Sequence, residues 1–192
     1  MREIRIVDPN NLWFTSDTHF GHQNIIRWCG RPWETAEEMD AALIQKWNEV
    51  VPKDGIIFHL GDFCFGGASE WKKIRNSLNG KIYLVMGNHD SSASQPMLGL
   101  FEKTYGGIAR LKVNHQEIWL SHFPLLCWTG SERGSWNLFG HVHTMLVPDD
   151  KQLGSDFPRV NSLKTQKQYD VGVDFNNYRP ISFTEIKNKL NI

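Results

Sequence analysis

The most constraining feature of this chain is a set of five short polar motifs, each placed just after a predicted buried strand or very near one. In α/β folds, ligands bind beyond the carboxyl ends of the strands. The sequence therefore predicts that the motifs meet at one site. In chain order they are Asp17-Thr18-His19, Gly61-Asp62, Gly87-Asn88-His89-Asp90, Ser121-His122 and Gly140-His141-Val142-His143.

The segments between the motifs predict an α/β sandwich with mixed sheets, because strands and helices alternate early and strands dominate later. Thr35 and Glu38 form a capping box, which predicts a helix that ends at Pro52. No linker rich in Pro, Gly or Ser divides the chain, so one domain over residues 1–192 is expected. Strands are expected at 12–17, 55–60, 81–86, 108–113, 117–121, 136–139 and 169–173, a second helix at 69–78, and a last strand and helix within 180–190.

Charge and cysteine content exclude several classes of protein. Lys+Arg and Asp+Glu both number 21, so no bulk basic charge is present to hold nucleic acid non-specifically. The start of the chain has no apolar signal-peptide core, and no run approaches the ~20 apolar residues of a membrane span. Cys29, Cys64 and Cys127 are an odd number without a C-x-x-C pair, so we expect a reducing, cytoplasmic location and no membrane partner.

Apart from Asp90, the motifs together carry two carboxylates, one amide and five imidazoles, which are the donor groups of a metal centre. This set suits divalent ions such as Mn, Fe, Co, Ni or Zn. On extended backbone, side chains at i and i+2 point the same way, so Asp17 and His19 are expected to grip one ion. His141 and His143 have the same spacing. Asp62 is the candidate for a carboxylate that touches two ions.

Such a centre would act on phosphate esters. Two ions about 4 Å apart would clamp a phosphate and lower the pKa of a bridging water, and the resulting hydroxide would attack phosphorus in line. The leaving oxygen then needs a proton. His89 is the candidate general acid, oriented by its neighbour Asp90.

These motifs resemble those of the calcineurin-like metallophosphoesterases, whose pattern is D-x-H, G-D, G-N-H-D/E, H and G-H-x-H. Every element is present in family order from Asp17 to His143, as in a small bacterial or phage-type member. The resemblance implies a four-layer fold, with two mixed β-sheets in a sandwich flanked by helices. It also implies two divalent ions, expected to be Mn or Fe, with Zn, Ni or Co as alternatives.

The same resemblance implies a role for each matching residue. His89 would contact the phosphate and act as the acid, with Asp90 behind it. One ion would take Asp17, His19, Asp62 and His143, and the other Asp62, Asn88, His122 and His141.

Three further residues are candidate substrate contacts. His22 lies just past the first motif, where it faces the metals or substrate or else stabilises a turn. Arg27 and Arg133 carry guanidinium groups that suit phosphate oxygens, with an ordinary surface position as the alternative. Trp128 and Trp136 are candidates for stacking on a nucleobase, although packing in the interior is the favoured interpretation.

The expected activity is hydrolysis of a phosphodiester or a small nucleotide, because a short chain without capping insertions leaves an open cleft. A phosphomonoesterase, including a protein phosphatase, is one alternative. A nuclease is another, which the neutral charge balance disfavours. The third is a non-catalytic metal-binding scaffold of the same fold. The sequence specifies neither the natural substrate nor the oligomeric state.

Overall fold

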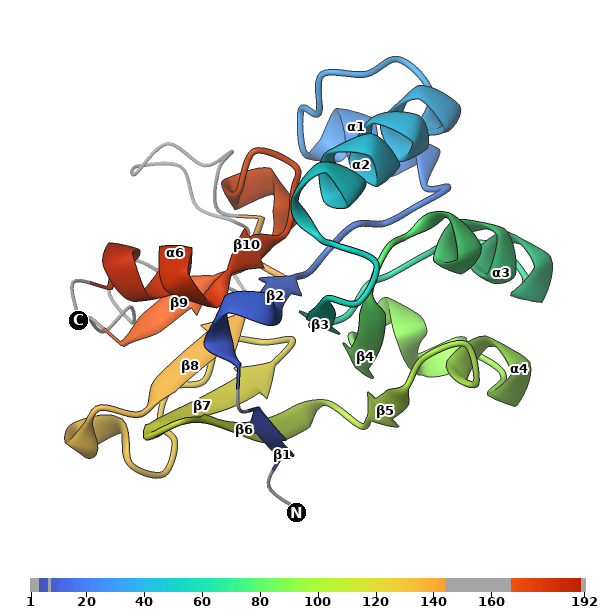
Figure 1. Cartoon of the computed structure of the whole chain (residues 1–192). Coiled ribbons are helices and arrows are strands. Elements are labelled where there is room, and N and C mark those ends of the chain that lie inside the picture. The colour runs from blue at the N-terminus through green and yellow to red at the C-terminus, as the bar shows by residue number, and fades with distance from the viewer. Residues whose placement is uncertain (1–3, 7, 144–166, 191–192) are drawn as a thin grey trace.

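Two five-stranded sheets packed face to face form the frame of the molecule (Figure 1). The computed structural model describes residues 4–6, 8–143 and 167–190. The first sheet has the order β10 (Ile181–Ser182), β2 (Leu12–Thr15), β3 (Ile56–His59), β4 (Lys81–Val85) and β5 (Lys103–Tyr105). The second has the order β1 (Ile4–Ile6), β6 (Ile108–Val113), β7 (Gln116–Ser121), β8 (Trp136–Phe139) and β9 (Gln168–Asp170).

Both sheets are mixed, as predicted. Strands β2 to β5 run parallel and β10 pairs antiparallel with β2. In the second sheet only β6 and β7 pair antiparallel. The carboxyl ends of β2, β3 and β4 therefore share one edge, and those of β7 and β8 share another. The hydrogen bond from the backbone of Asp17 to Gly61 joins two of the loops that follow these ends.

Helices cover the outer face of the first sheet (Figure 1). They are α1 (Gln23–Trp28), α2 (Ala36–Val50), α3 (Ala68–Ser77) and α4 (Gln95–Leu98), while α6 (Phe183–Lys189) follows β10. Helix α2 begins at the predicted capping box, with Thr35 accepting from the backbone of Glu38 and the Glu38 carboxylate accepting from that of Thr35. None of the helices among the described residues combines the length and apolar character needed to cross a bilayer.

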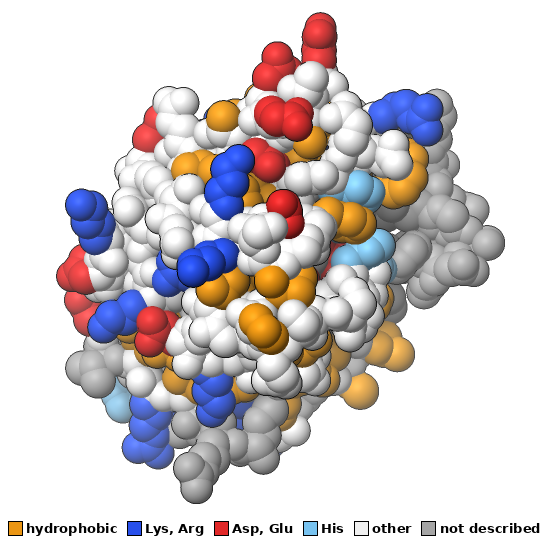
Figure 2. Space-filling view, turned by 90° about the vertical axis from the view of Figure 1, so that its right-hand side faces the viewer, with side chains coloured by type: hydrophobic (Ala, Val, Ile, Leu, Met, Phe, Trp, Pro, Cys, Tyr) orange, Lys and Arg blue, Asp and Glu red, His pale blue; other side chains and the backbone are white. Residues whose placement is uncertain are grey.

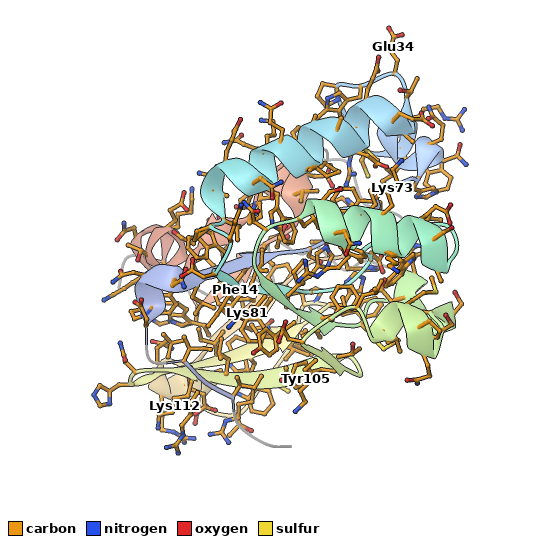
Figure 3. All side chains as sticks on the ribbon, turned by 45° about the vertical axis from the view of Figure 1, so that its right-hand side comes forward. Phe14, Glu34, Lys73, Lys81, Tyr105 and Lys112 are labelled. Carbon is orange, nitrogen blue, oxygen red and sulfur yellow. The ribbon has the colours of Figure 1, made fainter. Side chains whose placement is uncertain are left out.

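Alternation along the strands creates two hydrophobic cores. Trp13 faces the helices and packs with Met39 and Trp47 of α2. Its neighbour Phe14, labelled in Figure 3, packs with Leu120 of the other sheet. Successive side chains of a strand point to opposite faces, so one strand contributes to both cores. Strand β2 therefore packs against the helices on one side and against the second sheet on the other.

The predicted fold class is confirmed, and the helix and strand elements expected from the sequence are present near their predicted positions. Four short elements, β1, β5, α1 and α4, were not predicted from the sequence. These elements have three, three, six and four residues. Such segments are too short for hydrophobic periodicity to distinguish them from loops.

Candidate metal centre

All seven expected ligands lie where the carboxyl ends of strands from both sheets meet. From the first sheet come Asp17 and His19 after β2, Asp62 after β3 and Asn88 after β4; from the second come His122 after β7 and His141 and His143 after β8.

Six of these side chains form two groups of three. We call Asp17, His19 and His143 the Asp17 group, and Asp62, His122 and His141 the Asp62 group. Within each group, one potential ligand atom per residue lies within 4.8 Å of the others. The seventh side chain, Asn88, belongs beside the Asp62 group, because its Oδ1 is 2.9 Å from Nε2 of His122.

The carboxylate of Asp62 also reaches the Asp17 group, so it lies between the histidines of both groups. Its Oδ2 is 3.5 Å from Nε2 of His19 and 3.4 Å from Nε2 of His122. Burial raises the pKa of Asp62, but the hydrogen bond with His122 and the charges of His122 and His19 outweigh burial and lower it well below its usual range. An ionised carboxylate in this position is suited to touch two cations at once.

The ligand backbone corrects one step of the sequence analysis. Asp17 and His19 have φ values of 58° and 50°, so they lie on left-handed and not on extended backbone. His141 and His143 are also left-handed, at 71° and 43°, and they contribute to different groups. Asp62 shares this conformation, with a φ of 56°. Non-glycine residues in this region are uncommon and are held there by the surrounding structure, and five of them gather at this one centre.

Two glycines allow the loops of the centre to approach one another closely. A Cβ added to Gly140 would meet the side chains of Ser16 and Asp17. A Cβ added to Gly87 would meet the carboxylate of Asp62 and lie 2.7 Å from its backbone nitrogen. Each of these glycines therefore lies against a carboxylate of the candidate centre.

Unsatisfied polar atoms in the Asp17 group fit a bound cation. Within the described part of the chain, Oδ1 of Asp17 and both ring nitrogens of His19 are buried without a hydrogen bond. Such atoms are rare in folded proteins because desolvation is costly. Carboxylate oxygens and imidazole nitrogens are ligands for divalent transition metals. The donor set and its unmet bonding capacity therefore fit a metal ion.

In the Asp62 group, a backbone carbonyl orients the ring of His122. Nδ1 of His122 is 2.7 Å from the carbonyl oxygen of Leu60, which can only accept, so Nδ1 carries the proton. Nε2 then faces Asn88 and lies 3.1 Å from Nδ1 of His141. Burial followed by the charge of His122 lowers the pKa of His141 to about 4, which keeps this ring neutral and able to bind a metal.

A buried pair that the sequence analysis missed supports the Asp17 group. Oδ2 of Asp174 is 2.6 Å from Nδ1 of His143. Arg31 donates to both oxygens of Asp174 at 2.8 Å and to the carbonyl oxygens of Asp17 and Thr18 at 2.7 and 2.9 Å. Carboxylate-to-histidine contacts of this kind fix the ring of a metal ligand.

The negative charge of Asp174 is balanced by the positive charges of Arg31 and His143. Burial raises the pKa of Asp174, but the His143 hydrogen bond and the Arg31 charge outweigh it and lower the pKa to about 2. Burial lowers the pKa of His143, but its hydrogen bonds with Asp174 and Cys29 outweigh it and raise the pKa to about 11. Without an ion this ring is therefore charged, and a cation bound to it would have to displace a proton. Arg31 and Asp174 are 143 residues apart, and neither lies in a recognisable motif.

The ring of His89 is accessible beside the candidate ligands. Its side chain is 46% exposed, and its Nε2 is 4.0 Å from Oδ2 of Asp62. The expectation for Asp90 needs a correction. Its carboxylate accepts backbone N–H bonds from Asp62, Phe63 and Gly87, so it braces the loops instead of the His89 ring.

Of the three expected substrate contacts, the structure brings His22 to the site. Its ring centroid lies 5.6 Å from that of His19. Arg27 is exposed on α1. Arg133 is exposed and pairs with its neighbour Glu132 at 2.6 Å.

The aromatic side chains at the site differ from those that the sequence analysis considered. Trp128 and Trp136 are buried, which agrees with the favoured packing interpretation. Phe65, which that analysis did not single out, stacks on His22 at 3.8 Å between ring centroids. Trp28 contacts the other end of this pair, with its ring centroid 5.4 Å from that of His22. Isolated aromatics in short elements carry no periodic signal that would have identified them.

Similar proteins are known from archaea and bacteriophages. An uncharacterized protein of Methanocaldococcus jannaschii is 31% identical over 173 residues, covering 89% of this chain and 86% of that protein. The Gene 66 protein of Mycobacterium phage D29 is 30% identical over 193 residues, covering 86% of this chain and 88% of that protein. A crystal structure of a protein of unknown function from Aquifex aeolicus superposes with a TM-score of 0.69 at 25% identity, covering 92% of this chain and 97% of that one.

The profile of the calcineurin-like phosphoesterases matches residues 11–178, which include every motif described above. Members of this family bind divalent metal ions and act on phosphate esters, in agreement with the ligand groups found here. The chain belongs to the calcineurin-like phosphoesterase family.

Proposed function

We propose that this protein hydrolyses a phosphodiester or a small nucleotide at a dinuclear site that holds Mn or Fe. The single observation that carries the proposal is the position of Asp62 between the two ligand groups, with the exposed ring of His89 beside it. Two divalent ions bound there would supply Lewis acidity toward the phosphoryl oxygens and an activated water.

The protein's own groups then perform the remaining steps. Asp17, His19 and His143 hold one side of the site, and Asp62 is shared with the other side. His89 donates a proton to the leaving oxygen, which is otherwise expelled as a poorly stabilised alkoxide. The His89 backbone N–H donates to Oδ1 of Asp62 at 2.9 Å, which couples the position of the acid to that of the shared ligand.

The charges near the site favour a diester over a monoester. A monoester dianion needs more positive groups than a diester monoanion. Arg31 is buried and already donates to Asp174 and two backbone carbonyls. Arg133 is already paired with Glu132. The Arg31 guanidinium is therefore not available as a clamp for a dianion, and Arg133 is a surface residue that the structure does not bring to the site.

The test is Mn-supported hydrolysis of bis-p-nitrophenyl phosphate beside p-nitrophenyl phosphate. We expect the diester to react faster. His89→Ala should lower the rate on this diester, and on a substrate with an alkoxide leaving group the loss should reach about 10²-fold or more, the range of general acid catalysis. His115→Ala is the matched control, because His115 is exposed at the turn between β6 and β7.

The leaving group sharpens this test. p-Nitrophenolate is a stable anion and needs little protonation, whereas the alkoxide leaving group of a dinucleotide needs a proton. An acid role for His89 therefore predicts a larger defect of His89→Ala on a dinucleotide than on bis-p-nitrophenyl phosphate. Turnover of the monoester alone would support a phosphomonoesterase. Binding of two metal ions without hydrolysis of any ester would support the scaffold alternative.

A further inference from the structure

A continuous row of aromatic rings leads from the surface to the proposed acid. The ring centroids are 5.4 Å apart between Trp28 and His22, 3.8 Å between His22 and Phe65, and 5.3 Å between Phe65 and His89. We call Trp28, His22 and Phe65 the aromatic row. Figure 2 shows histidine side chains reaching the surface on the right of that view, with hydrophobic side chains next to them.

Packing does not account for the outer end of this row. Trp28 is 62% exposed at the end of α1, whereas Ile25 and Ile26 supply the buried contacts of that helix. His22 occupies the N-cap position of α1 and makes no capping hydrogen bond there. Single exposed hydrophobic residues are common. Here, however, the exposed tryptophan contacts a stacked pair of rings that itself contacts two residues of the site, His19 and His89.

We propose that the aromatic row binds the planar base of a nucleotide whose phosphate lies at the metal centre. This inference rests on the proposed function and adds the class of substrate. Aromatic rings provide stacking surfaces that accept any nucleobase, since every base has a π face. Trp28 offers the most exposed surface of the row. Purines, which have the larger ring system, should therefore bind more tightly than pyrimidines.

The direction of the row determines which part of the substrate it contacts. Phe65 lies against His89, the group proposed to protonate the leaving oxygen. A nucleoside on that oxygen extends from the metals past His89 and onto the aromatic row. The two tryptophans that the sequence analysis considered for stacking, Trp128 and Trp136, are buried and do not offer this surface.

The test compares the binding of AMP and ribose 5-phosphate to the Mn-loaded protein by calorimetry. The two probes share the phosphate and the sugar and differ in the base. We expect AMP to bind about tenfold more tightly. Trp28→Leu should remove most of this difference and leave the affinity for ribose 5-phosphate unchanged, while Trp28→Phe should restore most of it. Ile108→Ala, which alters another exposed hydrophobic residue, should keep the full difference.

Each outcome separates this inference from the proposed function. Hydrolysis of diesters together with equal affinities for the two probes would overturn the aromatic row and leave the hydrolytic function standing. A base-dependent affinity without hydrolysis of any ester would support the row and count against the hydrolytic function. If Trp28→Leu changes the oligomeric state and neither affinity, Trp28 is a protein contact and the inference is wrong.

Discussion

The two ligand groups are built in different ways, although each supplies two histidines and one aspartate. The Asp62 group is oriented by nearby backbone: the Leu60 carbonyl positions His122, and the Asp62 carboxylate accepts from the backbone of His89. The Asp17 group depends on side chains from distant parts of the chain, Arg31 and Asp174. The buried ligand atoms that lack hydrogen bonds all belong to the Asp17 group among the described residues.

This difference suggests how each group responds to metal. The Asp62 group satisfies most of its polar atoms within the protein, so its geometry should persist without an ion. The Asp17 group has polar atoms that only a ligand would satisfy, so it should gain more from binding one. Substitutions in and around each group test this contrast, and the largest effect is expected where one change affects both groups.

Asp62→Asn should damage both groups at once, because this carboxylate lies between them. We expect activity on bis-p-nitrophenyl phosphate to fall by more than about 100-fold, the upper end of the loss caused by groups that only support a ligand. Metal analysis should show fewer than two ions per chain. A variant that retains two ions and near-normal activity would mean that Asp62 is not shared.

Asp174→Asn should act on the Asp17 group alone. The change leaves Arg31 buried without its ion-pair partner, and loss of such a partner typically costs about 3–5 kcal/mol of stability. His143 also loses its charged support, so one of two Mn binding steps should weaken by about 10–100-fold. Calorimetric titration of protein shown to be folded by circular dichroism measures both steps.

The control for this change is Glu185→Gln, which removes an ion pair with Arg179 at the start of α6. It should leave both Mn binding steps unchanged. If Asp174→Asn instead weakens both steps equally, the two groups are coupled and the contrast between them does not hold.

Alanine at the two close-packed glycines should disturb different parts of the centre. A Cβ at Gly140 would meet Asp17, and one at Gly87 would meet Asp62. We expect each change to destabilise the fold by about 1–3 kcal/mol, the typical penalty for overpacking. Gly140→Ala should weaken mainly one Mn binding step and Gly87→Ala should weaken both, because Asp62 is shared. Gly106→Ala has open space around its Cβ and should change neither stability nor binding.

The candidate ligands could be proposed from the sequence because they stand in short motifs at the ends of buried strands, and the structure brings their side chains together. Asp62 could be recognised as a candidate shared ligand for the same reason. The support of the Asp17 group could not, because Asp174 and Arg31 meet only through the tertiary fold and each looks like an ordinary charged residue in sequence. The left-handed backbone of Asp17 likewise has no signature in residue type. The sequence thus predicts which side chains gather at the candidate centre but not the contacts that hold them there.

The smallest expected effect concerns the turn that leads away from the Asp17 group. The backbone N–H of Gly21, two residues after His19, donates to both oxygens of Asp40 at 2.9 and 3.0 Å. Burial raises the pKa of Asp40 from 3.8 to about 6, although this hydrogen bond opposes the shift. Asp40 therefore holds its proton more tightly in the folded protein, and its contribution to stability is lost as the pH rises through about 6.

Asp40→Asn removes this titration. Relative to the variant, the wild-type protein should lose about 1 kcal/mol of stability between about pH 4 and pH 7, a value reduced for the solvent that reaches this partly exposed group. Urea unfolding of both proteins in EDTA across this interval measures the difference without a contribution from metal binding. Parallel curves would show that Asp40 titrates normally. A large loss of Mn affinity in the variant would instead place the Gly21 turn within the support of the Asp17 group, beside Arg31 and Asp174.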